Sequence, residues 1–138
     1  MSNFKLNIFT PNGVVIKGME CNELFIPTTS GEINVLKDHT HVLSEVSTGI
    51  LTAKTGMGDR HFSMTSGLVK VLGEEITVLS TTSEKAEDID IERAKSAKAK
   101  AQSRLSEIDK LTSIDQIKFK RKLERADIRI KLKELHKN

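Results

Sequence analysis

Glycine and proline, the residues that most often interrupt regular structure, are confined to one end of the chain. All eight glycines lie at or before Gly73, both prolines lie within the first 27 residues, and the remaining 65 residues contain neither. Charge is divided in a similar way: residues 1–84 carry six Lys and Arg against nine Asp and Glu, whereas residues 85–138 carry sixteen against ten. We therefore expect two domains, with residues 85–138 forming a basic, helical one.

The first 82 residues contain short apolar runs that are separated by turn residues. Period-2 alternation is visible within them, for example at residues 4–8 and 68–72. Turn signals such as Pro11-Asn12-Gly13 and Gly73-Glu74 follow one another at intervals of about 8–12 residues, which is typical of an all-β sandwich. We expect residues 1–84 to form an antiparallel β-sandwich with strands over residues 4–10, 14–18, 23–29, 32–36, 41–46, 49–55, 60–66, 68–72 and 75–81.

The chain offers few residues for catalysis or for metal binding. His39 and His41 would share one face of a strand, but no third ligand stands at a suitable spacing, so no metal is expected. Nothing resembles a nucleophile elbow, a P-loop or a GxGxxG motif, and an enzyme acting alone is not expected. Cys21 is the only cysteine, which suits a reducing compartment. No apolar run approaches the roughly 20 residues of a membrane span, so membrane contact is expected only through a complex.

Residues 85–138 show the periodicity of two amphipathic helices. The first is expected over residues 89–110, with Asp88 and Asp90 at its positively polarised start. Ser113 and Gln116 have the spacing of a capping box, so a second helix is expected from there to about residue 136. The three-residue turn predicts an antiparallel hairpin. Its first helix presents mainly alanine to the second, so little apolar area is buried and the hairpin is able to open.

The basic residues of the hairpin also recur at helical spacing. Most are expected to form a solvated face whose aliphatic stems cover the apolar seam. Nucleic acid is the rival ligand, and a nucleic-acid- or ribosome-associated module is the alternative function. Ten interleaved acids and the scarcity of aromatic residues argue against nucleic acid as a partner. The cations form two rows: Arg93, Lys100 and Arg104 in the first helix, and Lys118, Lys122, Arg125, Arg129 and Lys133 in the second.

The N-terminal half is similar to the epsilon subunits of F-type ATP synthases. The resemblance lies in Thr10-Pro11, Ile26-Pro27-Thr28, Gly31-Glu32-Ile33, Val35-Leu36 and His39, although Asn34 and the residues flanking His39 depart from the family pattern. It implies a noncatalytic subunit of the central stalk of a bacterial, proton-translocating synthase, at the cytoplasmic face of the inner membrane. It also implies that Glu32 and His39 lie where the sandwich meets the gamma subunit and the c-ring. The hairpin would extend toward the catalytic alpha and beta subunits and inhibit ATP hydrolysis.

The same resemblance extends to a motif that binds ATP in some bacterial members of the family. Ile89-Asp90-Ile91-Glu92-Arg93-Ala94 matches the motif I-D-x-x-R-A. Lys100 stands where ATP-binding members tend to have arginine, which keeps the charge and loses the two-pronged contact with phosphate. No cofactor is required on this interpretation, and ATP is a regulatory ligand. The resemblance implies a binding site made of Glu84, Ile89, Asp90, Arg93, Ala94, Lys100, Arg125 and Arg129.

Overall fold

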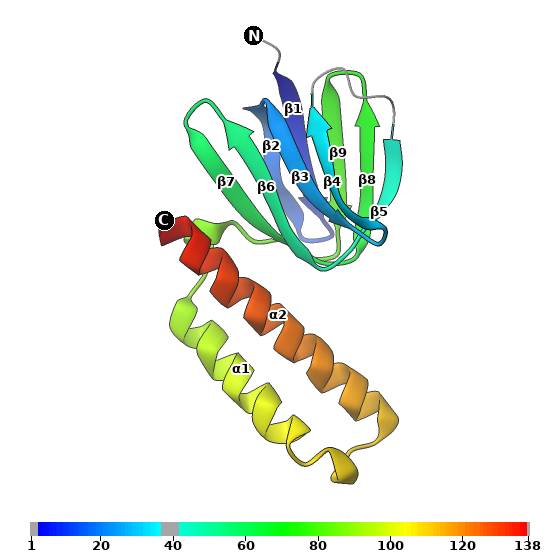
Figure 1. Cartoon of the computed structure of the whole chain (residues 1–138), viewed down its shortest axis with the longest axis vertical. Helices are drawn as coiled ribbons and strands as arrows, with labels where there is room; N and C mark the ends of the chain where they lie inside the picture. The colour runs from blue at the N-terminus through cyan, green and yellow to red at the C-terminus, as the bar shows by residue number, and fades with distance from the viewer. Residues whose placement is uncertain (1–2, 37–41, 138) are drawn as a thin grey trace. The chain divides into compact units, whose positions relative to one another are not determined.

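The computed structural model describes residues 3–36 and 42–137, and the chain divides into two compact units. Residues 1–86 form the first unit and residues 87–138 the second, so the division lies two residues after the predicted boundary. Figure 1 shows strands in the first unit and helices in the second. The predicted fold class, a β-sandwich followed by two helices, is confirmed.

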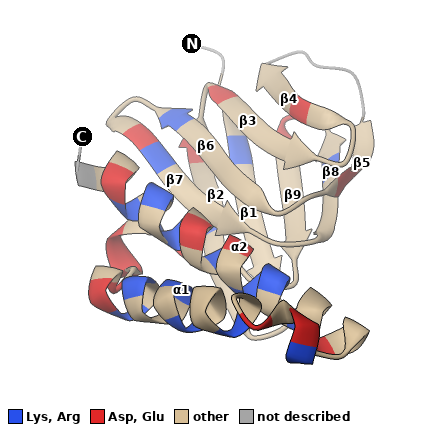
Figure 2. Ribbon diagram, turned by 60° about the horizontal axis from the view of Figure 1, so that its bottom comes forward, with Lys and Arg blue, Asp and Glu red and all other residues tan. Residues whose placement is uncertain are grey.

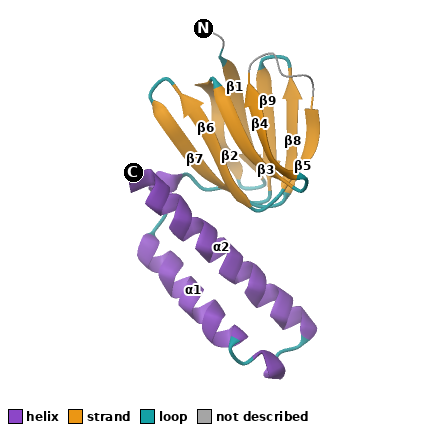
Figure 3. Ribbon diagram, viewed as in Figure 1, coloured by secondary structure: helices purple, strands orange, loops and turns teal. Residues whose placement is uncertain are grey.

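The nine predicted strand regions correspond to nine strands among the described residues. Strands β1 and β6 match their predicted ranges, and the others differ at their ends by one to three residues, as expected where turns and strands meet. Figure 3 shows all of them in orange. The strands are β1 (Phe4–Thr10), β2 (Gly13–Cys21), β3 (Glu23–Thr28), β4 (Gly31–Leu36), β5 (Val42–Val46), β6 (Gly49–Thr55), β7 (Gly58–Met64), β8 (Gly67–Leu72) and β9 (Glu75–Ser80).

The strands follow the order β2-β1-β9-β8-β5-β3-β6-β7, and β4 pairs with β3. Among the residues that the structure describes, a single registered pair, Thr28 with Val46, connects β3 to β5, so the sheet turns there from one layer to the other. Every registered strand pair is antiparallel except β1 with β9. A purely antiparallel sandwich was expected, and this parallel pair departs from it. Parallel strands need a long crossover connection, and here strands β2–β8 form the connection between β1 and β9.

Inward-facing residues of both layers form one apolar core. In β3 the side chains of Leu24 and Ile26 are fully buried, as period-2 alternation predicts. Cys21 is part of this core, and burial raises the pKa of its thiol to about 12. The thiol therefore stays protonated at neutral pH and acts as a small apolar side chain.

Residues 81–86, which we call the connector, are hydrogen-bonded to side-chain hydroxyl groups of the sandwich. The backbone N–H of Thr82 donates to Thr65 Oγ1 at 2.8 Å. The backbone N–H of Glu84 donates to Ser63 Oγ at 2.9 Å, and Ser63 N–H donates to the carbonyl of Glu84 at 2.9 Å. These bonds place the connector in the first unit, which explains why the division lies after residue 86.

The second unit is a helical hairpin made of α1 (Ile91–Leu105), the 3₁₀ turn η2 (Ile108–Lys110) and α2 (Ser113–Lys137). The predicted cap at Asp90 is observed, since its Oδ1 accepts from the backbone N–H of Arg93 at 3.1 Å. Three other details differ from expectation. Helix α1 begins at Ile91 and not at residue 89, because Asp90 is its N-cap. Helix α1 ends at Leu105 and not near residue 110, because the chain tightens into η2 there. The α2 cap is Thr112 rather than Ser113, because Thr112 Oγ1 accepts from Asp115 N–H at 3.1 Å.

Small residues occupy the seam between the two helices. Ala94 and Ala101 of α1 and Ala126 of α2 are buried. One ion pair, between Lys98 Nζ and Asp127 Oδ1 at 2.9 Å, also connects the helices, and a pair of this exposure contributes about 0–1 kcal/mol. Each alanine buries little apolar area, so the seam is held more weakly than one built from leucine. Among the described helices, neither α1 nor α2 is long and apolar enough to cross a membrane.

Candidate functional site

A cleft of about 790 Å³ lies between α1 and α2 and is surrounded by positive charge. Among the described residues, no aspartate or glutamate lines it. We call it the cationic cleft, and Figure 2 shows Lys and Arg along both of its helices. It is lined by six cations, Arg93, Lys100, Arg104, Lys122, Arg125 and Arg129, together with Ala97, Ala101, Ser103, Phe119 and Ala126.

The spacing of the cations along the sequence brings them to the same cleft. Arg93, Lys100 and Arg104 recur at intervals of seven and four residues, which brings them to one side of α1. Ala101 and Ala126 form part of the floor between the two rows, and their small side chains leave the space open. Arginine and lysine at such a cleft form short, charge-assisted hydrogen bonds to phosphate or carboxylate oxygens. The arrangement is therefore suited to an elongated anion.

One aromatic ring lies within this cleft. The guanidinium carbon of Arg104 is 5.1 Å from the centroid of the Phe119 ring, and Lys122 Nζ is 5.4 Å from it. Lys118 Nζ lies at 5.8 Å, although Lys118 does not line the cleft. Cations within about 6 Å of a ring are attracted by its electron-rich face. Phe119 thus orders the cations at the end of the cleft nearest the turn between the helices.

The residues predicted to bind ATP do not all come together. Arg93, Lys100, Arg125 and Arg129 all line the cleft. The other four have different surroundings: Asp90 caps α1, Ile89 and Ala94 are buried, and Glu84 belongs to the first unit. The structure therefore gathers four of the eight predicted residues, all of them cations, while the other four lie outside the lining of the cleft.

Seven lining residues were not assigned to a site from the sequence, and three of them, Arg104, Phe119 and Lys122, are charged or aromatic. Arg104 and Lys122 were recognised as members of the cationic rows, and Phe119 was expected only as part of an apolar stripe. The available signal was spacing along α2. Phe119 precedes Lys122 by three residues and Lys122 precedes Arg125 by three, so each is a neighbour of the next on the helix surface.

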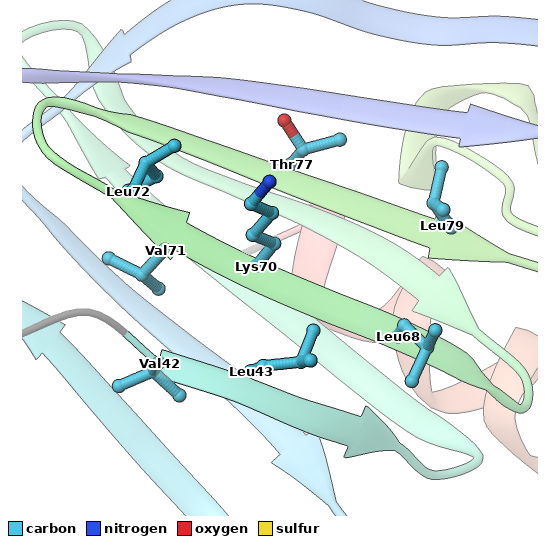
Figure 4. Close-up of a pocket in the computed structure, with 8 residues that line it drawn as sticks. All are labelled: Val42, Leu43, Leu68, Lys70, Val71, Leu72, Thr77 and Leu79. Atoms are coloured by element: carbon cyan, nitrogen blue, oxygen red, sulfur yellow. The ribbon is translucent and has the colours of Figure 1, made fainter.

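The sandwich has a second candidate site on the outer face of β5, β8 and β9. Four leucines are exposed there, Leu43 by 73%, Leu68 by 45%, Leu72 by 50% and Leu79 by 49%. We call this the apolar face, and Figure 4 shows these side chains around Lys70. Large contiguous apolar patches are uncommon on the surface of soluble proteins, and they often mark interaction sites.

Strand register extends the apolar face across the sheet. Leu68 pairs with Leu79, Leu79 pairs with Phe9 of β1, and Phe9 pairs with Val14 of β2. These four residues form one cross-strand row, in which Val14 is also exposed. Sequence reasoning missed this face, although one signal was available. The period-2 pattern of β8 places leucines on one side of the strand and valines on the other, so both sides carry apolar residues and the solvated side is apolar too.

The two residues predicted to meet partner subunits can be placed only in part. Glu32 lies on β4, is exposed, and pairs in register with Pro27 of β3. His39 and His41 lie outside the described residues.

Comparisons with known proteins give a consistent result over both units. The chain matches the ATP synthase delta/epsilon chain β-sandwich domain over residues 3–86, and the long α-helix domain of the same chain over residues 87–134. The ATP synthase epsilon chains of Staphylococcus aureus strains JH9 and Newman are each 36% identical to it over 135 residues, covering 98% of this chain and 99% of theirs. A chain in the Euglena gracilis mitochondrial ATP synthase OSCP/F1/c-ring structure shares the fold, with a TM-score of 0.76 at 19% identity over 90% of this chain and 77% of that one.

Proposed function

This chain belongs to the delta/epsilon chain family of F-type ATP synthases, and from that membership we propose that it couples the gamma subunit to the c-ring and restrains ATP hydrolysis. A chain of this family is a noncatalytic subunit of the central stalk. The observation that carries the regulatory part of the proposal is the convergence of six cations from two weakly packed helices on one cleft. The proposed complex lies at the cytoplasmic face of a bacterial inner membrane, and the chain reaches the membrane only through it.

The sandwich supplies the attachment to the rotor. The apolar face offers four exposed leucines that a second protein surface can cover, and we assign the gamma subunit to it. Glu32, on the hairpin of β3 and β4, is assigned to the c-ring contact together with His39. An apolar patch supplies most of the affinity in such an interface, and charged residues at its rim favour the correct partner.

The hairpin supplies the regulation. Its seam of small residues is held weakly, so opening costs little, and the exposed cationic rows can then contact acidic surfaces of the catalytic subunits. ATP bound between α1 and α2 requires both helices together, and a ligand that binds one state stabilises it. Abundant ATP therefore keeps the hairpin folded, and scarce ATP releases it to inhibit hydrolysis.

Removal of residues 87–138 tests this function in the assembled complex. We expect the shortened chain to assemble with gamma and the c-ring, because the docking surfaces are all in the sandwich, and the complex to hydrolyse ATP faster than one with the full chain. The measurement is the steady-state rate of ATP hydrolysis by purified complexes of equal subunit content. An unchanged rate would contradict the inhibitory role, and a failure to assemble would contradict the assignment of docking to the sandwich.

A further inference from the structure

We propose that Lys70, in the middle of the apolar face, pairs with a carboxylate that the gamma subunit presents opposite it, and that this charge pair selects the partner. This inference rests on the proposed docking of gamma on the apolar face and adds the chemistry that the docking surface must have. The observation that carries it is that strand register places acids beside two comparable lysines of the sandwich and none beside Lys70.

The surroundings of Lys70 on the outer face are largely apolar. Along β8 it lies between Leu68 and Leu72, which point to the same side of the sheet. Across the sheet, its registered neighbours are Leu43 of β5 and Thr77 of β9. Figure 4 shows its ammonium group among these side chains. A protein surface that covers the leucines therefore also covers Lys70.

Two other lysines of the described strands have registered neighbours on both sides, and both lie between acids. Lys5 lies between Glu20 and Glu75, and Lys54 lies between Glu23 and Asp59. Opposite charges at neighbouring cross-strand positions stabilise a sheet. Lys70 differs from both lysines, because neither of its registered neighbours is charged, and among the described residues it forms no ion pair.

The charge of Lys70 needs a counter-charge only when the face is covered. On the free chain Lys70 is exposed, so water solvates its ammonium group. A second protein surface removes that water, and a covered, unpaired charge opposes association. A carboxylate opposite the ammonium group forms a short, charge-assisted hydrogen bond that offsets this cost. A cation at the same point of a wrong partner is repelled, so Lys70 discriminates between surfaces that are equally apolar.

Glu45 is the acid of this chain that lies nearest in the strand register. It is exposed on the same side of β5 as Leu43 and pairs in register with Leu68, which makes it a diagonal neighbour of Lys70. The two side chains form no ion pair in the part of the chain that the structure describes. Strand β5 is the last strand of this layer, so Glu45 lies at the border of the apolar face and stays solvated there.

Surface plasmon resonance between the full chain and a gamma-type subunit tests the inference. We expect Lys70→Met to weaken binding by about 30-fold or more through faster dissociation, because it leaves the gamma carboxylate covered and unpaired. Lys70→Glu should weaken binding further, and Lys70→Arg, which keeps the charge, should weaken it less than Lys70→Met. Unchanged or tighter binding by Lys70→Met would overturn the proposal, since the lysine would then reach water at the rim of the interface. A loss confined to slower association would overturn it too, because a rim charge acts in that way.

Matched variants locate the counter-charge. Lys54→Met removes the same charge from β6, which does not carry the apolar face, and should leave the affinity within about twofold. Glu45→Gln should do the same. If Glu45→Gln weakened binding as much as Lys70→Met, the counter-charge would lie within this chain and the gamma carboxylate would be rejected. In double-mutant cycles, one acid of gamma should be coupled to Lys70, and coupling to none would refute the pair.

Failure of this inference is distinguishable from failure of the proposed docking. Weaker binding by Leu68→Asp/Leu79→Asp and unchanged binding by Lys70→Met would keep gamma on the apolar face and reject the charge pair. Unchanged binding by both variants would reject the docking and the charge pair together.

Discussion

Asp90 and Arg93 stand three residues apart in one motif, yet their side chains act differently. The Asp90 carboxylate accepts a hydrogen bond from the backbone of Arg93 and so begins helix α1. The Arg93 side chain lines the cationic cleft. Replacing Asp90 affects binding indirectly, through loss of a helix cap of about 1 kcal/mol. Replacing a lining arginine would remove a direct contact with the anion that we propose binds there.

Arg125 provides the residue-scale prediction. We expect Arg125→Ala to weaken ATP binding to the full chain by roughly tenfold or more, since hydrogen bonds to charged groups contribute about 1.5–3 kcal/mol. Asp90→Ala should weaken it less. The measurement is calorimetry at millimolar ATP, and the control is Lys120→Ala, an exposed cation of the same helix that does not line the cleft. Equal affinities for Arg125→Ala and the unchanged chain would refute the assignment.

At the scale of elements, the connector over residues 81–86 is part of the sandwich. Its backbone bonds to Ser63 and Thr65 are part-buried, and Lys85 forms an isolated bridge with Phe62. The polar side chains of this segment resemble an ordinary linker in the sequence. Their partners on β7 and beside it give the segment a fixed path, so we expect opening of the hairpin to use residues after Ala86.

A truncation experiment distinguishes a connector that is hydrogen-bonded to the sandwich from a loose linker. A chain of residues 1–80 should be less stable than one of residues 1–86 by about 2 kcal/mol, because it leaves groups around Ser63 and Thr65 without partners. For a domain of this size, the loss lowers Tm by roughly 8–16 °C in thermal unfolding. Ser63→Ala within residues 1–86 removes one hydroxyl and should cause a smaller drop. Equal Tm values for the two lengths would show that the connector contributes nothing.

At the scale of the whole molecule, the two units are suited to different roles. The sandwich has a rigid apolar core and an exposed apolar face, which suits permanent attachment. The hairpin has a thin seam and a charged cleft, which suits a reversible change that a ligand controls. Because the apolar face and the cationic cleft lie in different units, we expect mutations to alter the proposed attachment and the proposed regulation separately.

The apolar face carries the molecule-scale prediction. Leu68→Asp/Leu79→Asp should weaken association with a gamma-type subunit by roughly 30-fold or more, since anchor residues each contribute more than about 1 kcal/mol. Both side chains are half-exposed, so Tm should change little. Binding is measured by surface plasmon resonance with the full chain. Met57→Asp, at a fully exposed hairpin tip away from this face, is the control, and undiminished binding by the leucine variant would assign gamma to another surface.

Much of this molecule follows from local sequence patterns. The confinement of glycine and proline, the period-2 runs and the 3.6-residue periodicity predicted a strand-rich unit and a helical hairpin, because each depends only on neighbouring residues. The two cationic rows and the motif around Asp90 were also visible. For the same reason, the cap at Asp90 could be predicted: its partner lies three residues away.

The tertiary structure decided which faces of these elements are covered. Period 2 groups Leu68 with Leu72 and Val69 with Val71, but both sets are apolar, and only the packing of the two layers shows that the valines are buried and the leucines exposed. The pairing of β1 with β9 and the meeting of Arg104 with Phe119 likewise join residues that are distant along the chain. The sequence by itself determined which residues form each strand and helix, and which side chains share a face of it. Folding alone determined which faces became core, cleft or exposed apolar surface, because burial depends on the partners that long-range packing brings together.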